Sequence, residues 1–193
     1  KNKFDIAGFA VGLVEEKKIL KKNKIKENDL VLAIPSSGLH SNGYSLVRYI
    51  LKKKRIDLRR NNKLKKDLLK PTKIYVNEIL KLNDKGLING CANITGGGLV
   101  DNLKRIIPNN LNVQIDLCKI VTHEIFKWIK KNNVSNKEML KTFNCGVGFC
   151  IVINPRNLEK VKKFFTKEYK PYVIGAVTKG LNKIKLYGNI NWE

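Results

Sequence analysis

Short apolar runs along the chain alternate with runs in which apolar residues recur every three or four positions. Continuous or alternating apolar runs predict strands over residues 4–15, 29–34, 91–95, 113–117, 146–153, 172–177 and 184–187. Helical spacing and capping residues predict helices over 45–54, 74–82, 99–106, 123–131, 135–143 and 155–167. Residues 21–28 and 55–70 are polar and charged, which predicts a turn and an irregular surface excursion. The alternation of strands and helices predicts an α/β (α+β) fold, with helices packed on a mixed sheet.

The length and composition fit one domain, or one and a half. The chain has 193 residues, of which 42% are hydrophobic, so it can fold without disulfides or metals. No run approaches the roughly 20 apolar residues of a membrane span. The start lacks the continuous apolar core of a signal peptide. Because the chain begins at Lys1 and turns apolar almost at once, we expect it to start inside a longer protein.

The formal net charge of +23 has two interpretations. A strongly basic protein can bind nucleic acid. The lysines are instead spread over nearly every predicted helix and turn, and no RNA-binding signature with interleaved aromatic residues occurs. We therefore favour lysine-rich solvated surfaces and expect neither a nucleic-acid nor a membrane partner. The four cysteines form no CxxC pair, so we expect reduced thiols in a cytoplasmic protein and no metal site.

Three polar, glycine-rich loops share one design. They cover residues 36–43, 95–98 and 142–148, each at a predicted junction between a strand and a helix. Glycines permit close backbone approach, and successive N–H groups can then cradle an anion. One such loop also serves as an ordinary turn, but three in one small domain favour ligand binding. Neither a P-loop nor a dinucleotide-binding motif is present.

The two histidines differ in their surroundings. His40 lies in the first loop among small polar residues, so it either makes a structural hydrogen bond or contacts a substrate near neutral pH. His123 precedes an amphipathic helix without such neighbours, and we expect it to be structural or exposed. Cys145 lies in the third loop, and its role stays open.

Several segments together resemble one enzyme family. They are DIAGFAVG (5–12), SSGLHSNGYSLVR (36–48), PTKIYV (71–76), ITGGGLVDNLKRIIP (94–108), IFKWI (125–129), EMLKTFNCGVGFCIVI (138–153) and VIGAV (173–177). In this order and spacing they resemble the C-terminal half of the aminoimidazole ribonucleotide synthetase (phosphoribosylformylglycinamidine cyclo-ligase) family, over essentially the whole chain. Selenophosphate synthetase, thiamine-monophosphate kinase and the related amidine synthetase share the architecture but are not expected to match all these segments.

The resemblance implies a purine-biosynthesis ligase that uses ATP and Mg²⁺ to close an imidazole ring on formylglycinamidine ribonucleotide. Phosphorylation of the formyl oxygen makes it a good leaving group, an amidine-side nitrogen attacks the imidate carbon, and phosphate departs. The family completes its ATP site, binds metal and forms its homodimer through an N-terminal half. The implied domains are residues 1–16, the end of that half or a connecting strand, and residues 17–193, the C-terminal synthetase domain.

The resemblance also assigns roles to residues of the three loops. His40 is implied in proton transfer or in stabilising the departing phosphate. The residues implied to bind substrate or phosphate are Ser37, Ser41, Asn42, Gly43, Gly96, Gly97, Gly98, Asn144 and Gly146. No metal ligand is implied in this chain. Two alternatives stay open, a basic nucleic-acid-binding module and a catalytically degenerate subunit of the same fold. We expect no cyclo-ligase activity from this chain alone.

Overall fold

One six-stranded sheet organises the chain, and the computed structural model describes it within residues 7–193. Its order is β2-β4-β1-β5-β3-β6. The strands are β1 (Leu30–Pro35), β2 (Gly90–Asn93), β3 (Leu111–Asp116), β4 (Val147–Ile153), β5 (Tyr172–Lys179) and β6 (Ile184–Tyr187). Neighbouring strands are antiparallel, except that β3 and β6 are parallel. The predicted mixed sheet is therefore confirmed.

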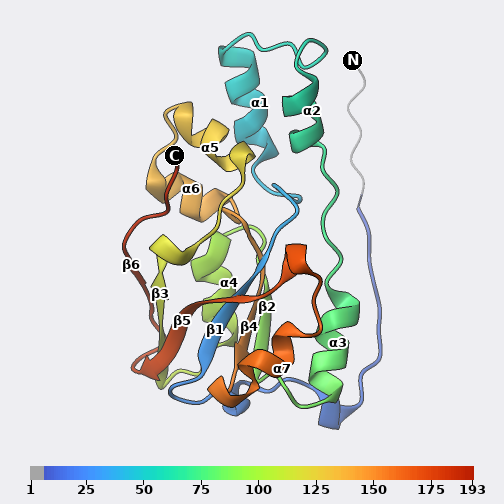
Figure 1. Cartoon of the computed structure of the whole chain (residues 1–193), viewed down its shortest axis with the longest axis vertical. Coiled ribbons are helices and arrows are strands. Elements are labelled where there is room, and N and C mark those ends of the chain that lie inside the picture. The colour runs from blue at the N-terminus through green and yellow to red at the C-terminus, as the bar shows by residue number, and fades with distance from the viewer. Residues whose placement is uncertain (1–6) are drawn as a thin grey trace.

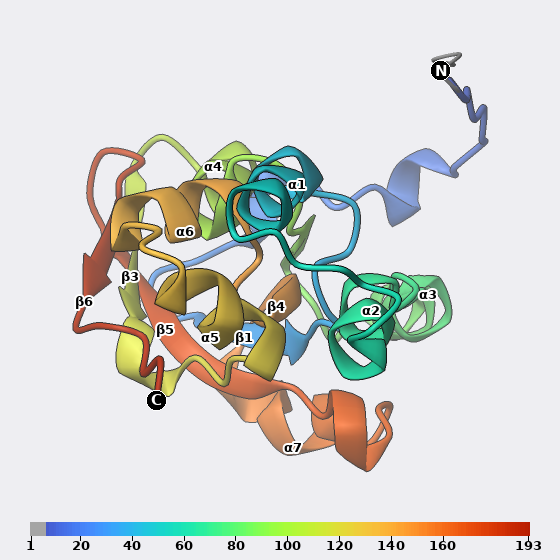
Figure 2. The ribbon, with the colours of Figure 1, turned by 90° about the horizontal axis from the view of Figure 1, so that it is seen from above.

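Helices cover both faces of this sheet (Figures 1 and 2). The α-helices are α1 (Tyr44–Lys53), α2 (Asn62–Leu68), α3 (Val76–Asp84), α4 (Gly98–Ile106), α5 (Glu124–Lys131), α6 (Asn136–Thr142) and α7 (Leu158–Lys162). Short 3₁₀ turns are η1 (Glu16–Lys18), η2 (Lys22–Lys24), η3 (Leu117–Lys119), η4 (Pro155–Asn157) and η5 (Lys167–Tyr169). Within residues 7–193, no helix combines the length and the apolar character that crossing a bilayer requires.

Strand β1 shows why the central strands are apolar throughout. Successive side chains point to opposite faces. Val31 and Ala33 pack into the core under α1, α4, α5 and α6, whereas Leu32 and Ile34 pack under α3 and α7. All four side chains are fully buried, because both faces of β1 are covered and β4 and β5 pair with its two edges.

The structure corrects three predictions of secondary structure. Residues 7–15 form no strand, and Phe9, Val11 and Leu13 are fully exposed, because no neighbouring backbone pairs with them; residues 4–6 of that predicted strand lie outside the described residues. The irregular excursion over 55–70 contains helix α2. The predicted helix over 155–167 is only a 3₁₀ turn followed by α7.

Both helix corrections have a physical reason. In α2, the Asn61 side chain caps the helix by accepting from the Leu64 amide, and Leu64 and Leu68 are buried one turn apart among charged residues. After α7 the chain turns, and both Phe164 and Phe165 pack on the core. In a continued helix these adjacent side chains would diverge by about 100°.

Candidate functional site

The three glycine-rich loops converge at one end of the sheet, the upper end in Figure 1. Strand β4 is antiparallel to both β1 and β2, so its start lies beside the ends of those strands. The Ser36 amide donates to the Gly146 carbonyl at 2.8 Å, and the Ile94 amide donates to the Gly148 carbonyl at 3.1 Å. Main-chain hydrogen bonds therefore hold the three loops close together at this end of the sheet.

Two helices begin at this convergence without a side-chain cap. Helix α1 follows Gly43 and helix α4 follows Gly97, and both glycines are left-handed, with φ of 82° and 90°. A Cβ at Gly96 would lie 3.5 Å from Asn42 Oδ1, so the two loops touch. Uncapped helix N-termini present free N–H groups and the positive end of the helix dipole. Two of them side by side form a site suited to an anion such as phosphate.

Glycine is required at several of these positions because the backbones approach closely. A Cβ at Gly43 would overlap the Phe143 ring, and one at Gly98 would overlap the Leu140 carbonyl oxygen. Gly98 also has φ of +64°, a region that side chains other than glycine rarely adopt. The glycines thus let α1 and α4 begin against the segment that leads into β4.

Asn144 positions the histidine loop, defined as residues 36–43. Its side chain is buried, and Nδ2 donates to the carbonyl of Gly38 at 2.9 Å and to that of Leu39 at 3.3 Å. Its Oδ1 accepts from the Gly146 amide at 2.9 Å. Because both its Nδ2 and its Oδ1 bond to the main chain, the Asn144 side chain holds the histidine loop in place.

His40 is buried and neutral. It has a left-handed backbone, with φ of 59°, and its ring lies against Gly148 and 6.2 Å from the Tyr75 ring. Nε2 accepts a hydrogen bond from the Ser37 amide at 3.2 Å, so the neutral ring carries its proton on Nδ1. Burial, and secondarily the electrostatic influence of His123, lowers the pKa of His40 to about 4.

The predicted serine and asparagine residues fall into two groups. The Ser37 hydroxyl donates to the Pro71 carbonyl at 2.6 Å and accepts from the Lys73 amide at 3.1 Å, so it ties the histidine loop to the segment before α3. Ser41 is exposed and Asn42 is half-buried. Among the described residues, these two side chains make no hydrogen bond and are free to contact a ligand.

Three further residues around the loops went unassigned in the sequence. His123 Nε2 lies 2.7 Å from the Ser36 carbonyl oxygen, and the Tyr75 hydroxyl donates to the Pro35 carbonyl at 2.8 Å. Lys73 pairs with Glu78 at 2.8 Å beside the same segment. Within the sequence, only the PTKIYV segment gave a signal for Lys73 and Tyr75, and nothing distinguished His123 from a surface residue.

A cavity of about 210 Å³ adjoins the outer side of the histidine loop. Ser37, Gly38 and His123 line it together with Lys63 and Lys70, while Asp67 and Glu124 balance the two lysines. Across residues 7–193, no group of three or more His, Cys, Asp or Glu side chains could hold a metal ion.

Cys145 has a structural role in the third loop. Its thiol is buried and donates to the Met139 carbonyl at 3.3 Å. Burial raises the pKa of this thiol to about 12, so it stays protonated at neutral pH. A thiolate nucleophile is therefore not available at this position.

Comparison with known proteins adds a family and several relatives. Residues 26–186 match the family model described as AIR synthase related protein, C-terminal domain. The chain is 43% identical over 188 residues to phosphoribosylformylglycinamidine cyclo-ligase of Thermodesulfovibrio yellowstonii, covering 93% of this chain and 55% of that relative. It is 40% identical over 185 residues to the enzyme of the same name from Streptococcus pneumoniae, covering 93% and 54%. The chain thus spans about half the length of the curated relatives it matches.

Solved structures share the fold at low sequence identity. Thiamine-monophosphate kinase from Stenotrophomonas maltophilia superposes with a TM-score of 0.60 at 13% identity, covering 92% of this chain and 56% of that one. PurLQS from Thermotoga maritima superposes with a TM-score of 0.55 at 12% identity, covering 86% and 25%. At such identities the likeness shows the architecture alone.

Proposed function

Because this chain belongs to the family of AIR synthase related proteins, through the C-terminal domain of that family, we propose that it is the C-terminal part of a phosphoribosylformylglycinamidine cyclo-ligase. In this proposal the complete enzyme closes the imidazole ring of formylglycinamidine ribonucleotide and hydrolyses ATP. The formyl oxygen takes a phosphoryl group from ATP, an amidine-side nitrogen attacks the activated carbon, and phosphate departs with that oxygen. Both the substrate and ATP carry phosphates that the protein must bind.

The single observation that carries the proposal is the pair of uncapped helix N-termini at α1 and α4. The first turns of α1 and α4, joined through the contact of Asn42 with Gly96, offer free N–H donors to phosphate oxygens, except for the Gly98 amide, which donates to the Thr95 carbonyl at 3.1 Å. Such fixed donors stabilise charge that develops on a transferred phosphoryl group. We assign ligand contacts to Ser41, Asn42 and the backbone amides of Gly96 and Gly97, because the Gly98 amide is already bonded.

Of the other site residues, three position the histidine loop and His40 contacts the phosphate in this proposal. Ser37, Asn144 and Gly146 hold the histidine loop in place through the bonds described above. His40 is neutral, so it donates a hydrogen bond from Nδ1–H to the departing phosphate and does not act as a charged acid. The low pKa thus favours the second of the two roles that the resemblance implied.

The proposal extends to magnesium, the oligomer and the compartment. The described residues carry no carboxylate cluster for a metal, so we assign Mg²⁺ and the remaining ATP contacts mainly to the N-terminal half of the enzyme. We further propose that residues 1–16 connect to that half, that residues 17–193 form the synthetase domain, and that the full enzyme is a cytoplasmic homodimer.

A chimaeric enzyme tests this function. The N-terminal part of the Thermodesulfovibrio yellowstonii relative is fused to this chain, and ATP-dependent ring closure is measured. We expect activity from the chimaera, none from the 193-residue chain alone, and a loss of about 100-fold in turnover for His40→Ala. A well-folded but inactive chimaera would contradict the function, whereas an active chimaera with unchanged His40→Ala turnover would contradict only the role of His40.

A further inference from the structure

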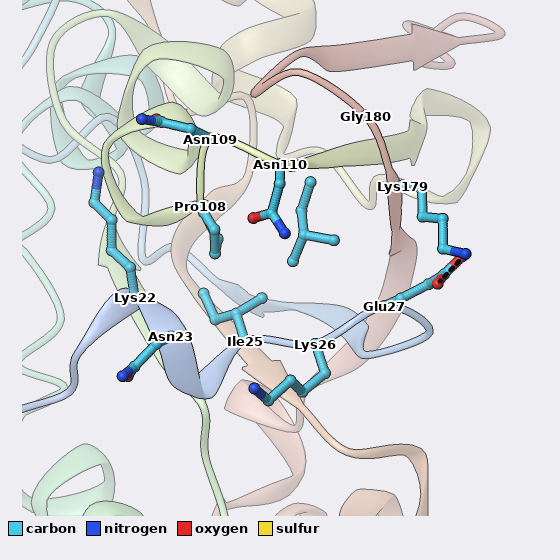
Figure 3. Close-up of a pocket in the computed structure, with 11 residues that line it drawn as sticks. Lys22, Asn23, Ile25, Lys26, Glu27, Pro108, Asn109, Asn110, Lys179 and Gly180 are labelled. Carbon is cyan, nitrogen blue, oxygen red and sulfur yellow. Dashed lines mark ion pairs between the residues drawn. The ribbon is translucent and has the colours of Figure 1, made fainter.

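One buried peptide group, between Ser36 and Ser37, is bonded by both histidines of the chain. The two serines are only 1% and 6% exposed. No comparable convergence occurs at the cavity of about 880 Å³ beside the end of β5, because the tips of Asn23, Lys26 and Asn109 point away from it (Figure 3). The peptide group at the start of the histidine loop is therefore where polar groups meet.

The two hydrogen bonds of this peptide group run in one direction. The Ser36 carbonyl oxygen lies 2.7 Å from His123 Nε2, and the Ser37 amide donates to His40 Nε2 at 3.2 Å. A carbonyl oxygen only accepts, so His123 Nε2 carries a proton, whereas an amide N–H only donates, so His40 Nε2 carries none. His123, the 36–37 peptide group and His40 thus form a chain of hydrogen bonds, here called the peptide bridge.

The peptide bridge is held rigidly because the preceding peptide group is also bonded at both of its polar atoms. The Tyr75 hydroxyl donates to the Pro35 carbonyl at 2.8 Å, and the Ser36 amide donates to the Gly146 carbonyl at 2.8 Å. These partners come from two separate segments, one before α3 and one before β4. Neither peptide group can turn without leaving a buried donor or acceptor unpaired.

His123 is placed for its contact by the start of α5. Its carbonyl accepts from the Phe126 amide at 2.9 Å, and its half-buried ring lies with its centre 6.2 Å from that of the Phe126 ring. As the N-cap residue it has an extended backbone, and its side chain makes no capping bond to the helix. The imidazole is therefore free to reach the Ser36 carbonyl, 87 positions earlier in the chain.

Donation by His123 polarises the peptide group, and hydrogen bonds in such a chain strengthen one another. The Ser37 N–H then binds the lone pair of His40 Nε2 more firmly, which leaves the ring proton on Nδ1. We propose that His123 is a positioning residue, which acts through the peptide bridge to hold His40 in its Nδ1–H form. Under the proposed function, on which this role rests, that Nδ1–H donates to the departing phosphate.

NMR spectroscopy of the ¹⁵N-labelled 193-residue chain tests the peptide bridge directly. At pH 7 the His40 ring is neutral, because its pKa is about 4, and two-bond ¹H–¹⁵N correlations show which ring nitrogen carries the proton. We expect a protonated Nε2 in His123, and in His40 a protonated Nδ1 with an unprotonated Nε2. A His40 ring with its proton on Nε2 would overturn the proposal.

Variants at position 123 separate the donor from the packing of the ring. His123→Leu and His123→Phe both remove the donor, so the test does not depend on one of them folding. Each should shift the ratio of the two neutral His40 tautomers about fivefold or more toward Nε2–H. His123→Gln keeps an N–H donor for the Ser36 carbonyl and should preserve the original ratio. The matched control is Tyr172→Phe, which removes the bond between the Tyr172 hydroxyl and the Val121 amide, 3.2 Å apart and two residues before His123.

Turnover of the chimaeric enzyme gives a second readout. His123→Leu should lower kcat by about tenfold with little change in KM, because the peptide bridge acts on His40 and not on substrate binding. His123→Gln and Tyr172→Phe should retain the activity.

Four outcomes overturn the proposal. They are an unchanged His40 tautomer ratio once the donor is removed, an equal shift of that ratio in Tyr172→Phe, a shift in His123→Gln as large as in His123→Leu, and an active chimaera whose kcat does not respond to His123→Leu. An inactive chimaera contradicts the proposed function alone, because the NMR measurements require no catalysis.

Discussion

Replacing Asn144 by alanine removes the three side-chain hydrogen bonds that hold the histidine loop against the start of β4. The Gly38 carbonyl and the Gly146 amide lose these partners inside the protein, where water does not replace them. Leaving a buried donor or acceptor unpaired costs about 1–3 kcal/mol each. We therefore expect Asn144→Ala to lower the free energy of unfolding by about 3 kcal/mol, which lowers the Tm by about 6–12 °C in a chain of this size.

Urea and thermal unfolding followed by circular dichroism measure this loss. The matched control is Asn154→Ala, because exposed Asn154 makes a single capping bond to the Arg156 amide at 3.0 Å, and its loss costs about 1 kcal/mol. Hydrogen exchange gives a second readout, since the Ser37 amide should exchange faster once its loop loosens. An Asn144→Ala loss no greater than that of the control would refute the argument that this side chain anchors the loop.

Three further predictions concern single groups. His40 has a pKa of about 4 when folded and an ordinary value near 6.5 when unfolded, so the unfolded chain binds more protons between these values. The free energy of unfolding should therefore fall as the pH drops from 6.5 to 4. The variant His40→Gln should flatten this dependence in urea titrations at several pH values. Gly98→Ala should lower the free energy of unfolding by about 2–4 kcal/mol because of the backbone conformation and close neighbours of Gly98, whereas Gly96→Ala should lower it by under about 1 kcal/mol in the same assay. Equal losses for the two variants would contradict the geometry. Iodoacetamide at pH 8 should label exposed Cys118 and spare Cys145 until urea unfolds the protein; rapid labelling of Cys145, located by mass spectrometry, would contradict its burial.

The strands could be predicted well where both faces are buried. Continuous apolar runs identified β1 and β4 because a strand covered on two faces has no polar side. The same signal failed at residues 7–15, where Phe9, Val11 and Leu13 alternate as in a strand but have no partner in the described chain. The periodicity of apolar residues shows which side chains a segment can bury. Strand pairing also depends on a neighbouring backbone, which this periodicity does not reveal.

The three glycine-rich loops could be identified from the sequence, but which of their side chains are already hydrogen-bonded could not. Glycine clusters identify loops that approach closely, and Gly43, Gly97 and Gly98 do have left-handed backbones. The sequence cannot show that Ser37 and Asn144 are already engaged, since the carbonyls to which these side chains donate lie at least 34 residues away along the chain. His123 was expected to be structural or exposed, but its contact with Ser36 could not be foreseen for the same reason, because it spans 87 positions.

The donors proposed at α1 and α4 belong to the main chain, and this affects how the site tolerates mutation. Every residue except proline carries the same N–H group, so most side-chain substitutions on these helices leave the donors unchanged. Mutational sensitivity should then concentrate at the few glycines that shape the turns. The rest of the surface is free to change, and a chain with 39 lysine and arginine residues against 16 acidic ones can have accumulated its charge without altering the main-chain donors proposed at α1 and α4.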